Sequence, residues 1–139
     1  MDSDPSKARA ALERSRVVAV LGAHTDPQRP AHYVPEYLSH HGYRILPVNP
    51  RFAGLILWGE PVRARLDELG EPVDIVDVFR RAEDLPGHIE EILAMKPPPK
   101  LVWMQLGIRN DAVAAVLQAA GIEVIQDRCT LADHRRFGL

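Results

Sequence analysis

Residues 17–30, VVAVLGAHTDPQRP, decide which fold this chain is expected to adopt. Five consecutive apolar residues, three of them valine, predict a short buried strand that ends at Gly22. Small, polar and proline residues follow, and a helix is predicted to begin near Ala31. A strand, a glycine turn and a helix start in this order present backbone N–H groups and the positive end of a helix dipole to an anion. The stretch therefore predicts a phosphate-bearing ligand at the 22–30 loop.

The rest of the chain repeats this alternation of apolar strand and helix. Further strands are predicted over 43–48, 73–79, 101–105 and 122–125. Helices are predicted over 5–14, 31–42, 82–95 and 110–120. Near-continuous apolar strands suit a parallel sheet that is covered on both faces. The pattern therefore predicts an α/β fold, a Rossmann-like doubly wound three-layer sandwich around a five-stranded, mainly parallel sheet, in the order 3-2-1-4-5.

Three local features refine this prediction. The N-terminal helix has Ser3 or Asp4 as its expected cap. Because proline is tolerated only in a first turn, Pro35 predicts that its helix starts nearer residue 34. The segment 54–59 is expected to form a short strand, which is a loop excursion or one arm of a small hairpin. In a doubly wound sheet, the ligand is expected at the carboxyl ends of the strands, where strands one and four adjoin.

Composition excludes several classes of protein. The 139 residues predict one domain over 1–139, with a core of about 15–130 after the N-terminal helix. A net charge of -2 gives no footprint for nucleic acid. No apolar run reaches the length of a membrane span, and the N-terminus does not read as a signal peptide. One cysteine, Cys129, excludes an internal disulfide and predicts a cytoplasmic location.

The residues after the second predicted strand indicate the type of nucleotide. The chain lacks both the G-x-G-x-x-G fingerprint and the acidic residue that would hold an unmodified ribose. Instead, Arg51 follows that strand, and a guanidinium attracts a phosphorylated ribose. Coenzyme A (CoA) and NADP are therefore both favoured over NAD, and this pattern does not separate the two.

Five sequence blocks occur in an order that is typical of one family. They are Gly22-Ala23-x-x-x-Pro27-x-Arg29-Pro30, Gly42-Tyr43-Arg44-x-x-Pro47-Val48-Asn49-Pro50, Val73-Asp74-Ile75-Val76-Asp77-Val78-Phe79-Arg80, Trp103-x-Gln105-x-Gly107-Ile108 and Asp127-Arg128-Cys129. Over roughly residues 15–130, the chain resembles the small stand-alone CoA-binding proteins. Their fold is similar to that of the CoA-binding domain of the succinyl-CoA synthetase α subunit. The resemblance implies a Rossmann-type sheet that binds CoA, and it implies no known reaction.

The resemblance also implies a set of cofactor-binding residues. The 22–25 turn and Arg29 would cradle the pyrophosphate, and residues 48–51 would border the adenosine. Residues 78–80 would lie along the adenine or the pantetheine, and Gln105, Gly107 and Ile108 along the pantetheine arm. The predicted residues are Gly22, Ala23, His24, Thr25, Arg29, Pro30, Val48, Asn49, Pro50, Arg51, Val78, Phe79, Arg80, Gln105, Gly107 and Ile108. The family commonly has serine or threonine at the position of His24, and Thr25 is the expected substitute for that hydroxyl.

The expected function is the binding of CoA or acyl-CoA, with no catalytic set and no metal. The alternatives are an NADP-dependent oxidoreductase and a nucleotide-binding subunit of a ligase-like complex. The oxidoreductase lacks support because no tyrosine has a lysine four residues later. The alanine-rich helix 110–120 could form the surface that docks onto the ligase-like partner, or a homodimer interface.

Four charged residues and the cysteine have more than one interpretation. One of Arg80 and Arg81 is expected to face the ligand, unless both pair with Glu83 or Asp84. Asp74 and Asp77 are three residues apart on a strand, so they point to opposite faces and cannot form a carboxylate pair. Capping or turn roles are expected for both. Cys129 could form a mixed disulfide with CoA, but a partly buried, unreactive thiol is the favoured interpretation.

Overall fold

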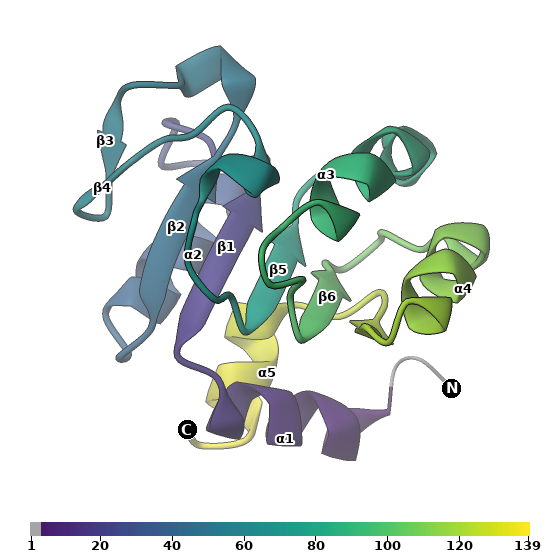
Figure 1. The fold of residues 1–139 in the computed structure, drawn as a ribbon. Coiled ribbons are helices and arrows are strands. Elements are labelled where there is room, and N and C mark those ends of the chain that lie inside the picture. Colours follow the sequence, from purple (N-terminus) through teal and green to yellow (C-terminus); the bar gives the residue numbers. More distant parts are fainter. Residues whose placement is uncertain (1–3) are drawn as a thin grey trace.

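The structure, a computed structural model, describes residues 4–139. A five-stranded sheet forms its middle layer, and every neighbouring pair of strands is parallel (Figure 1). The strands are β1 (Val17–Leu21), β2 (Arg44–Val48), β5 (Ile75–Val78), β6 (Leu101–Met104) and β7 (Glu123–Ile125). The predicted α/β, Rossmann-like class is confirmed.

Helices cover both faces of this sheet. One face packs against α1 (Pro5–Arg14), α2 (Pro30–Ser39) and α5 (Thr130–Arg136), with α1 and α5 side by side (Figure 1). The other face packs against α3 (Ile89–Leu93) and α4 (Asp111–Ala119). Successive residues of β1 alternate between the two cores, as the pleat of a strand requires. None of the helices within residues 4–139 has the length and apolar character that crossing a bilayer requires.

The order of the strands differs from the predicted 3-2-1-4-5. The observed order is β2-β1-β5-β6-β7, so the strand predicted over 73–79 lies next to β1 and not beyond β2. The outer edge of β2 is occupied by Arg63, whose N–H donates to Pro47 O at 3.0 Å and whose carbonyl accepts from Asn49 N–H at 2.8 Å. This segment follows a hairpin formed by β3 (Ile56–Leu57) and β4 (Glu60–Pro61), the expected excursion near 54–59. The segment that follows the hairpin therefore closes the edge at which a third strand was expected.

Two helices depart from their predicted bounds. α2 begins at Pro30, and Pro35 lies inside it rather than in its first turn. The predicted helix 82–95 is divided into a 3₁₀ segment, η3 (Ala82–His88), and α3, because Pro86 and Gly87 are poor residues for an α-helix. The other predicted ends hold: Asp4 caps α1, and Asn110 caps α4. Ser3, the other expected cap of α1, lies outside the described residues.

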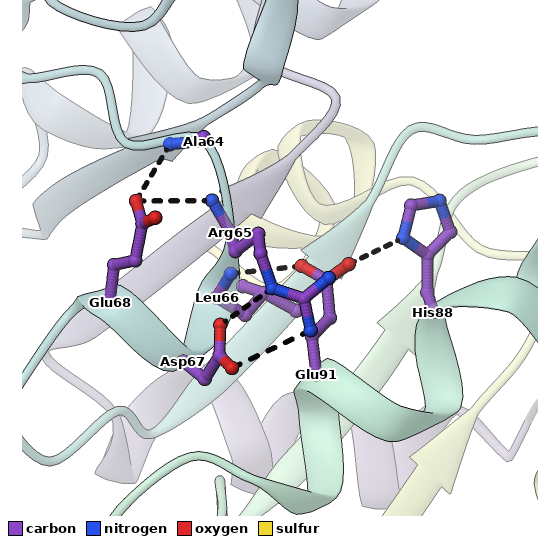
Figure 2. A network of polar contacts seen from close by, with 7 residues as sticks. All are labelled: Ala64, Arg65, Leu66, Asp67, Glu68, His88 and Glu91. Carbon is purple, nitrogen blue, oxygen red and sulfur yellow. Dashed lines mark hydrogen bonds and ion pairs between the residues drawn. The ribbon is translucent and has the colours of Figure 1, made fainter.

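The chain between β4 and β5 is held by a turn that packs against α3. Figure 2 shows this turn, η2 (Leu66–Glu68), beside the buried Glu91. Glu91 accepts from Leu66 N–H at 2.9 Å and lies 3.0 Å from Nδ1 of His88. Burial opposes the charge of Glu91, but the hydrogen bonds to His88 and Leu66 outweigh it and lower the pKa of the carboxyl. The turn is thereby tied to the layer that covers the sheet. A 3₁₀ segment after β2, η1 (Pro50–Phe52), completes the short helices.

Gly22 ends β1 in a conformation that requires glycine. Its φ is +94°, and a Cβ atom at this position would lie 2.7 Å from Phe79 O. The close approach arises because β1 and β5 are neighbours, and Phe79 N–H donates to Leu21 O at 2.9 Å. A side chain at residue 22 would therefore push apart the two central strands at the edge where they end.

Gly22→Ala is expected to lower the free energy of unfolding more than Gly42→Ala does. Gly42 has a similar φ of +90°, but a Cβ atom there would meet nothing within 4 Å. Left-handed strain costs both variants about 1–2 kcal/mol, and overpacking adds about 1–3 kcal/mol for Gly22→Ala alone. Chemical denaturation of both variants measures the difference. Equal losses would show that the approach of Phe79 imposes no constraint.

Candidate functional site

A pocket of about 1040 Å³ opens at the carboxyl edge of the sheet. Its walls come from the segments that follow β1, β2, β5 and β6, together with Cys129, which precedes α5. Ligands of doubly wound sheets bind where the chain reverses its direction of travel across the strands. Here that point is between β1 and β5, which corrects the prediction that it lies between the first and fourth strands. The expected edge of the sheet is nevertheless the edge that carries the pocket.

The pocket gathers most of the predicted cofactor-binding residues. Those that line it are Gly22, His24, Arg29, Pro30, Asn49, Pro50, Arg51, Phe79, Arg80, Gln105, Gly107 and Ile108. Ala23, Val48 and Val78 are instead fully buried in the two hydrophobic cores, and Thr25 lies beside the pocket without lining it. These four were predicted because they belong to the matching sequence blocks. The side chains of a strand alternate between its two faces, so some residues of each block point into a core.

Other pocket residues were missed by the sequence analysis. They are Ala31, Tyr33, Val34, Ala82, Glu83 and Leu106, whereas Arg81 and Cys129, which also line the pocket, were named above as residues that could contact the ligand. The first three belong to the opening turns of α2, whose start was predicted too late along the chain. Proline is favoured at the first helical position, so Pro30 was the signal that could have predicted the earlier start and these three residues.

The backbone amides of the glycine turn are largely used within the protein. Gly22 and Ala23 both donate to Val48 O, at 2.8 and 3.3 Å. His24 N–H donates to Ala31 O at 3.3 Å, a carbonyl that is free because Pro35, four residues on, has no N–H. Among the described residues, the amides of Thr25 and Ala31 have no hydrogen-bond acceptor. An anion at this loop would therefore meet those two amides and the nearby side chains.

His24 is held as a neutral hydrogen-bond donor. Its Nδ1 accepts from Asp26 N–H at 3.0 Å, which leaves the proton of the neutral ring on Nε2. Burial, followed by the nearby charges of Arg29 and Arg51, lowers the pKa of His24. Within residues 4–139, Nε2 is enclosed and has no acceptor. The imidazole therefore supplies an N–H group at the glycine turn.

Asn49 joins three of the segments that form the pocket. Its Nδ2 donates to Ala23 O at 2.9 Å. Its Oδ1 accepts from Arg51 N–H at 3.0 Å and from Nη2 of Arg80 at 3.3 Å. The side chain of Asn49 is buried, so these contacts are shielded from water. Asn49 thus fixes Arg80 against the pocket, where Arg80 Nε is enclosed without an acceptor among the described residues.

Positive charge is concentrated in the pocket of a chain whose net charge is -2. Four arginines line it, whereas Glu83 is the one carboxylate among the lining residues of the described chain. Arg81 pairs with Asp84 at 3.1 Å, which is the alternative that the sequence left open for it. Arg51 lies over the Phe52 ring at 5.0 Å, and Arg29 makes a long, exposed contact of 3.9 Å with Asp26. Among the described residues, neither Arg51 nor Arg80 forms an ion pair with a carboxylate, so both are available to an anionic ligand.

A buried carboxyl lies beneath the floor of the pocket. Asp77 is fully enclosed, and it accepts from Gln105 Nε2 at 2.6 Å and from Thr130 Oγ1 at 3.0 Å. Burial raises its pKa to about 7, although both hydrogen bonds act in the opposite direction. The expected capping or turn role is therefore wrong for Asp77. Asp74 accepts from the backbone amides of Arg16 and Val17, where the chain enters β1.

Cys129 lines the pocket as a partly buried thiol. Burial raises the pKa of the thiol, which favours the protonated, less reactive form. Within the described part of the chain, no group of three or more histidine, cysteine, aspartate or glutamate side chains could hold a metal ion. The pocket thus offers hydrogen-bond donors and positive charge near β1, β2 and β5, and a more neutral floor near β6.

Comparison with known proteins identifies the family. A family model described as "CoA binding domain" matches residues 16–135. This chain belongs to that CoA-binding family. The matched range contains every strand of the sheet and every residue that lines the pocket.

Individual relatives agree with this assignment. YneT of Bacillus subtilis is 38% identical over 133 residues, which cover 94% of this chain and 96% of YneT. A solved Thermus thermophilus protein, cell-free ID.343, is 52% identical with a TM-score of 0.90, covering 96% of this chain and 98% of that one. A dinucleotide-forming acetyl-coenzyme A synthetase of Ca. Korarchaeum cryptofilum is 18% identical and shows the fold alone. Its TM-score is 0.68, and the match covers 89% of this chain and 27% of the synthetase.

Asp77→Asn is expected to change the pH dependence of stability. The carboxyl has a pKa of about 7 when folded and an ordinary value of 3.8, so its favourable contribution is complete below 3.8 and is lost as the pH rises to 7. Asparagine does not titrate. Between pH 4 and 7, the free energy of unfolding of the variant should therefore rise relative to that of the wild type by on the order of 4 kcal/mol. Above about pH 8, the difference between the two should be constant.

Asp74→Asn is the matched control on the same segment. Burial opposes the charge of Asp74, but hydrogen bonds from the amides of Val17 and Arg16 lower its pKa overall. Its contribution is therefore lost only at acidic pH, and the deficit of this variant should stay constant from pH 5 to 8. Denaturant titrations across the pH range measure both variants. A constant difference for Asp77→Asn over pH 4–8 would contradict the raised pKa.

Proposed function

We propose that this chain binds coenzyme A in the pocket at the carboxyl edge of its sheet. The observation that carries this proposal is the concentration of guanidinium groups in that pocket, in a chain that is negatively charged overall. The CoA nucleotide has two groups of negative charge, the diphosphate and the 3′-phosphate. A pocket with separated arginines suits such a ligand better than one with a single phosphate.

The diphosphate is assigned to the space between the start of α2 and Arg80. The free amides of Thr25 and Ala31 and the positive end of α2 lie on one side of this space. Arg80 lies on the other side and has no carboxylate partner among the described residues. His24 Nε2 and Arg80 Nε are enclosed donors that lack acceptors, so small movements of these side chains would give both a phosphate oxygen.

The 3′-phosphate is assigned to Arg51. This side chain follows β2, the position at which Rossmann-type sites hold the ribose, and its guanidinium is anchored over Phe52. The pantetheine arm would then pass over Phe79, Gln105 and Ile108 toward Cys129.

Binding without catalysis is the proposed activity. The titratable groups near the pocket are held in their neutral or unreactive forms: His24 is neutral, Asp77 lies below Gln105, and Cys129 has a raised pKa. His24, Asp77 and Cys129 are not hydrogen-bonded to one another, so these three groups do not form a nucleophile and general base in contact. A carrier or sensor of CoA or acyl-CoA follows from this arrangement.

Calorimetric titration with CoA, dephospho-CoA, NADPH and NADH tests the proposal. CoA should bind most tightly, and removal of the 3′-phosphate should weaken binding roughly tenfold, since a charge-assisted hydrogen bond contributes about 1.5 kcal/mol or more. Equal, weak binding of all four ligands would reject the proposal. Tightest binding of NADPH would instead favour the oxidoreductase.

The same titration on two neighbouring variants locates the diphosphate. Arg80→Ala should weaken CoA binding by roughly 1.5–3 kcal/mol, because it removes a charge-assisted contact. Arg81→Ala is the matched control, since Arg81 is exposed and pairs with Asp84, and it should change affinity by less than about 0.5 kcal/mol. Similar losses for both variants would indicate general electrostatic attraction rather than a specific contact.

A further inference from the structure

The floor of the pocket contains one side chain whose orientation is determined by its surroundings. Gln105 is 5% exposed and lines the pocket. Both hydrogens of its amide nitrogen are used: Nε2 donates to Asp77 Oδ1 at 2.6 Å and to Thr130 Oγ1 at 2.9 Å. With Asp77 ionised, a flipped amide would place Oε1 against a carboxylate oxygen that can only accept, so the nitrogen points toward Asp77 and Thr130.

The oxygen of the same amide is left without a partner. Among the described residues, no group donates to Gln105 Oε1, and this atom is not among the enclosed side-chain atoms that lack hydrogen bonds. Because the rest of the side chain is buried, its open side is the pocket that it lines. Oε1 is therefore an acceptor that faces the ligand site, in a pocket whose other polar groups are mostly donors.

We propose that Gln105 Oε1 accepts a hydrogen bond from an amide N–H of the pantetheine arm, and that Asp77 and Thr130 are positioning residues that hold it in place. This inference rests on the proposed binding of CoA. Pantetheine has two secondary amides, whereas the nucleotide diphosphate has no group of this kind. The contact therefore distinguishes CoA from ligands that share only its nucleotide.

The observed orientation of Gln105 can be satisfied in both protonation states of Asp77. A proton on Oδ2 would be donated to Thr130 Oγ1, which can still accept from Gln105, while Oδ1 continues to accept from Gln105 Nε2. Asparagine at residue 77 reproduces this protonated arrangement.

The test compares CoA with 3′-phosphoadenosine 5′-diphosphate, which has the same nucleotide and no pantetheine. Gln105→Met keeps the length of the side chain and removes the amide. It should weaken CoA binding roughly 3- to 15-fold, the range of one neutral hydrogen bond, and should change the affinity for the nucleotide less than about twofold. Unchanged CoA affinity would overturn the proposal, and so would an equal loss for both ligands.

A double-mutant cycle tests the positioning role. Thr130→Val removes one anchor of Gln105 and should weaken CoA binding roughly 2- to 5-fold, whereas Thr130→Ser should restore the wild-type affinity. In the Gln105→Met background, Thr130→Val should have no further effect. A loss that persists there would show that Thr130 does not act through Gln105. Failure of the wild type to bind CoA would overturn the proposed function itself.

Discussion

The contact between Gly22 and the end of β5 is the constraint on which the site depends. β1 and β5 are adjacent, and the chain leaving β1 passes so close to Phe79 O that no side chain fits. This approach keeps the 22–29 loop low over the edge of the sheet. It also allows Arg80 to lie against the loop, since the Cδ of Arg80 is 3.4 Å from the position that a Cβ of residue 22 would occupy. Glycine at residue 22 therefore allows Arg80, which follows β5, to reach the pocket beside the loop that follows β1.

Two further residues convert this close approach into a fixed site. Pro35 leaves the Ala31 carbonyl free within α2, and that carbonyl receives the His24 amide. Asn49 ties the loop, the end of β2 and Arg80 through hydrogen bonds that are shielded from water. The loop and the guanidinium groups are thus positioned before a ligand arrives, and less conformational entropy is lost on binding.

Much of the fold was predictable because its signals are local. Apolar runs and glycine or asparagine at helix ends marked the strands and most helix boundaries. The strand order was not predictable in this way. It depends on long-range pairings such as the parallel bridge between Val48 and Arg63, which spans η1 and the β3–β4 hairpin and which no local pattern reveals. The error moved the switch point, but not the edge that carries the pocket.

The site was predictable to the level of segments and less so to the level of side chains. Sequence blocks found the loops after β1, β2, β5 and β6, yet they could not show that Val48 and Val78 face the core. The role of Asp77 was hidden for a related reason: its partners, Gln105 and Thr130, are 28 and 53 residues away and meet it only after the sheet has formed. Such long-range contacts require the structure.

The most direct test is nuclear magnetic resonance of the nitrogen-15-labelled chain during a titration with CoA. The free amides of Ala31, which lines the pocket, and of Thr25, which lies beside it, should show the largest shifts. Amides at the amino ends of the central strands, such as Val17 and Leu101, should not move. Largest shifts at those amino ends, or no shifts at all with millimolar CoA, would contradict the account.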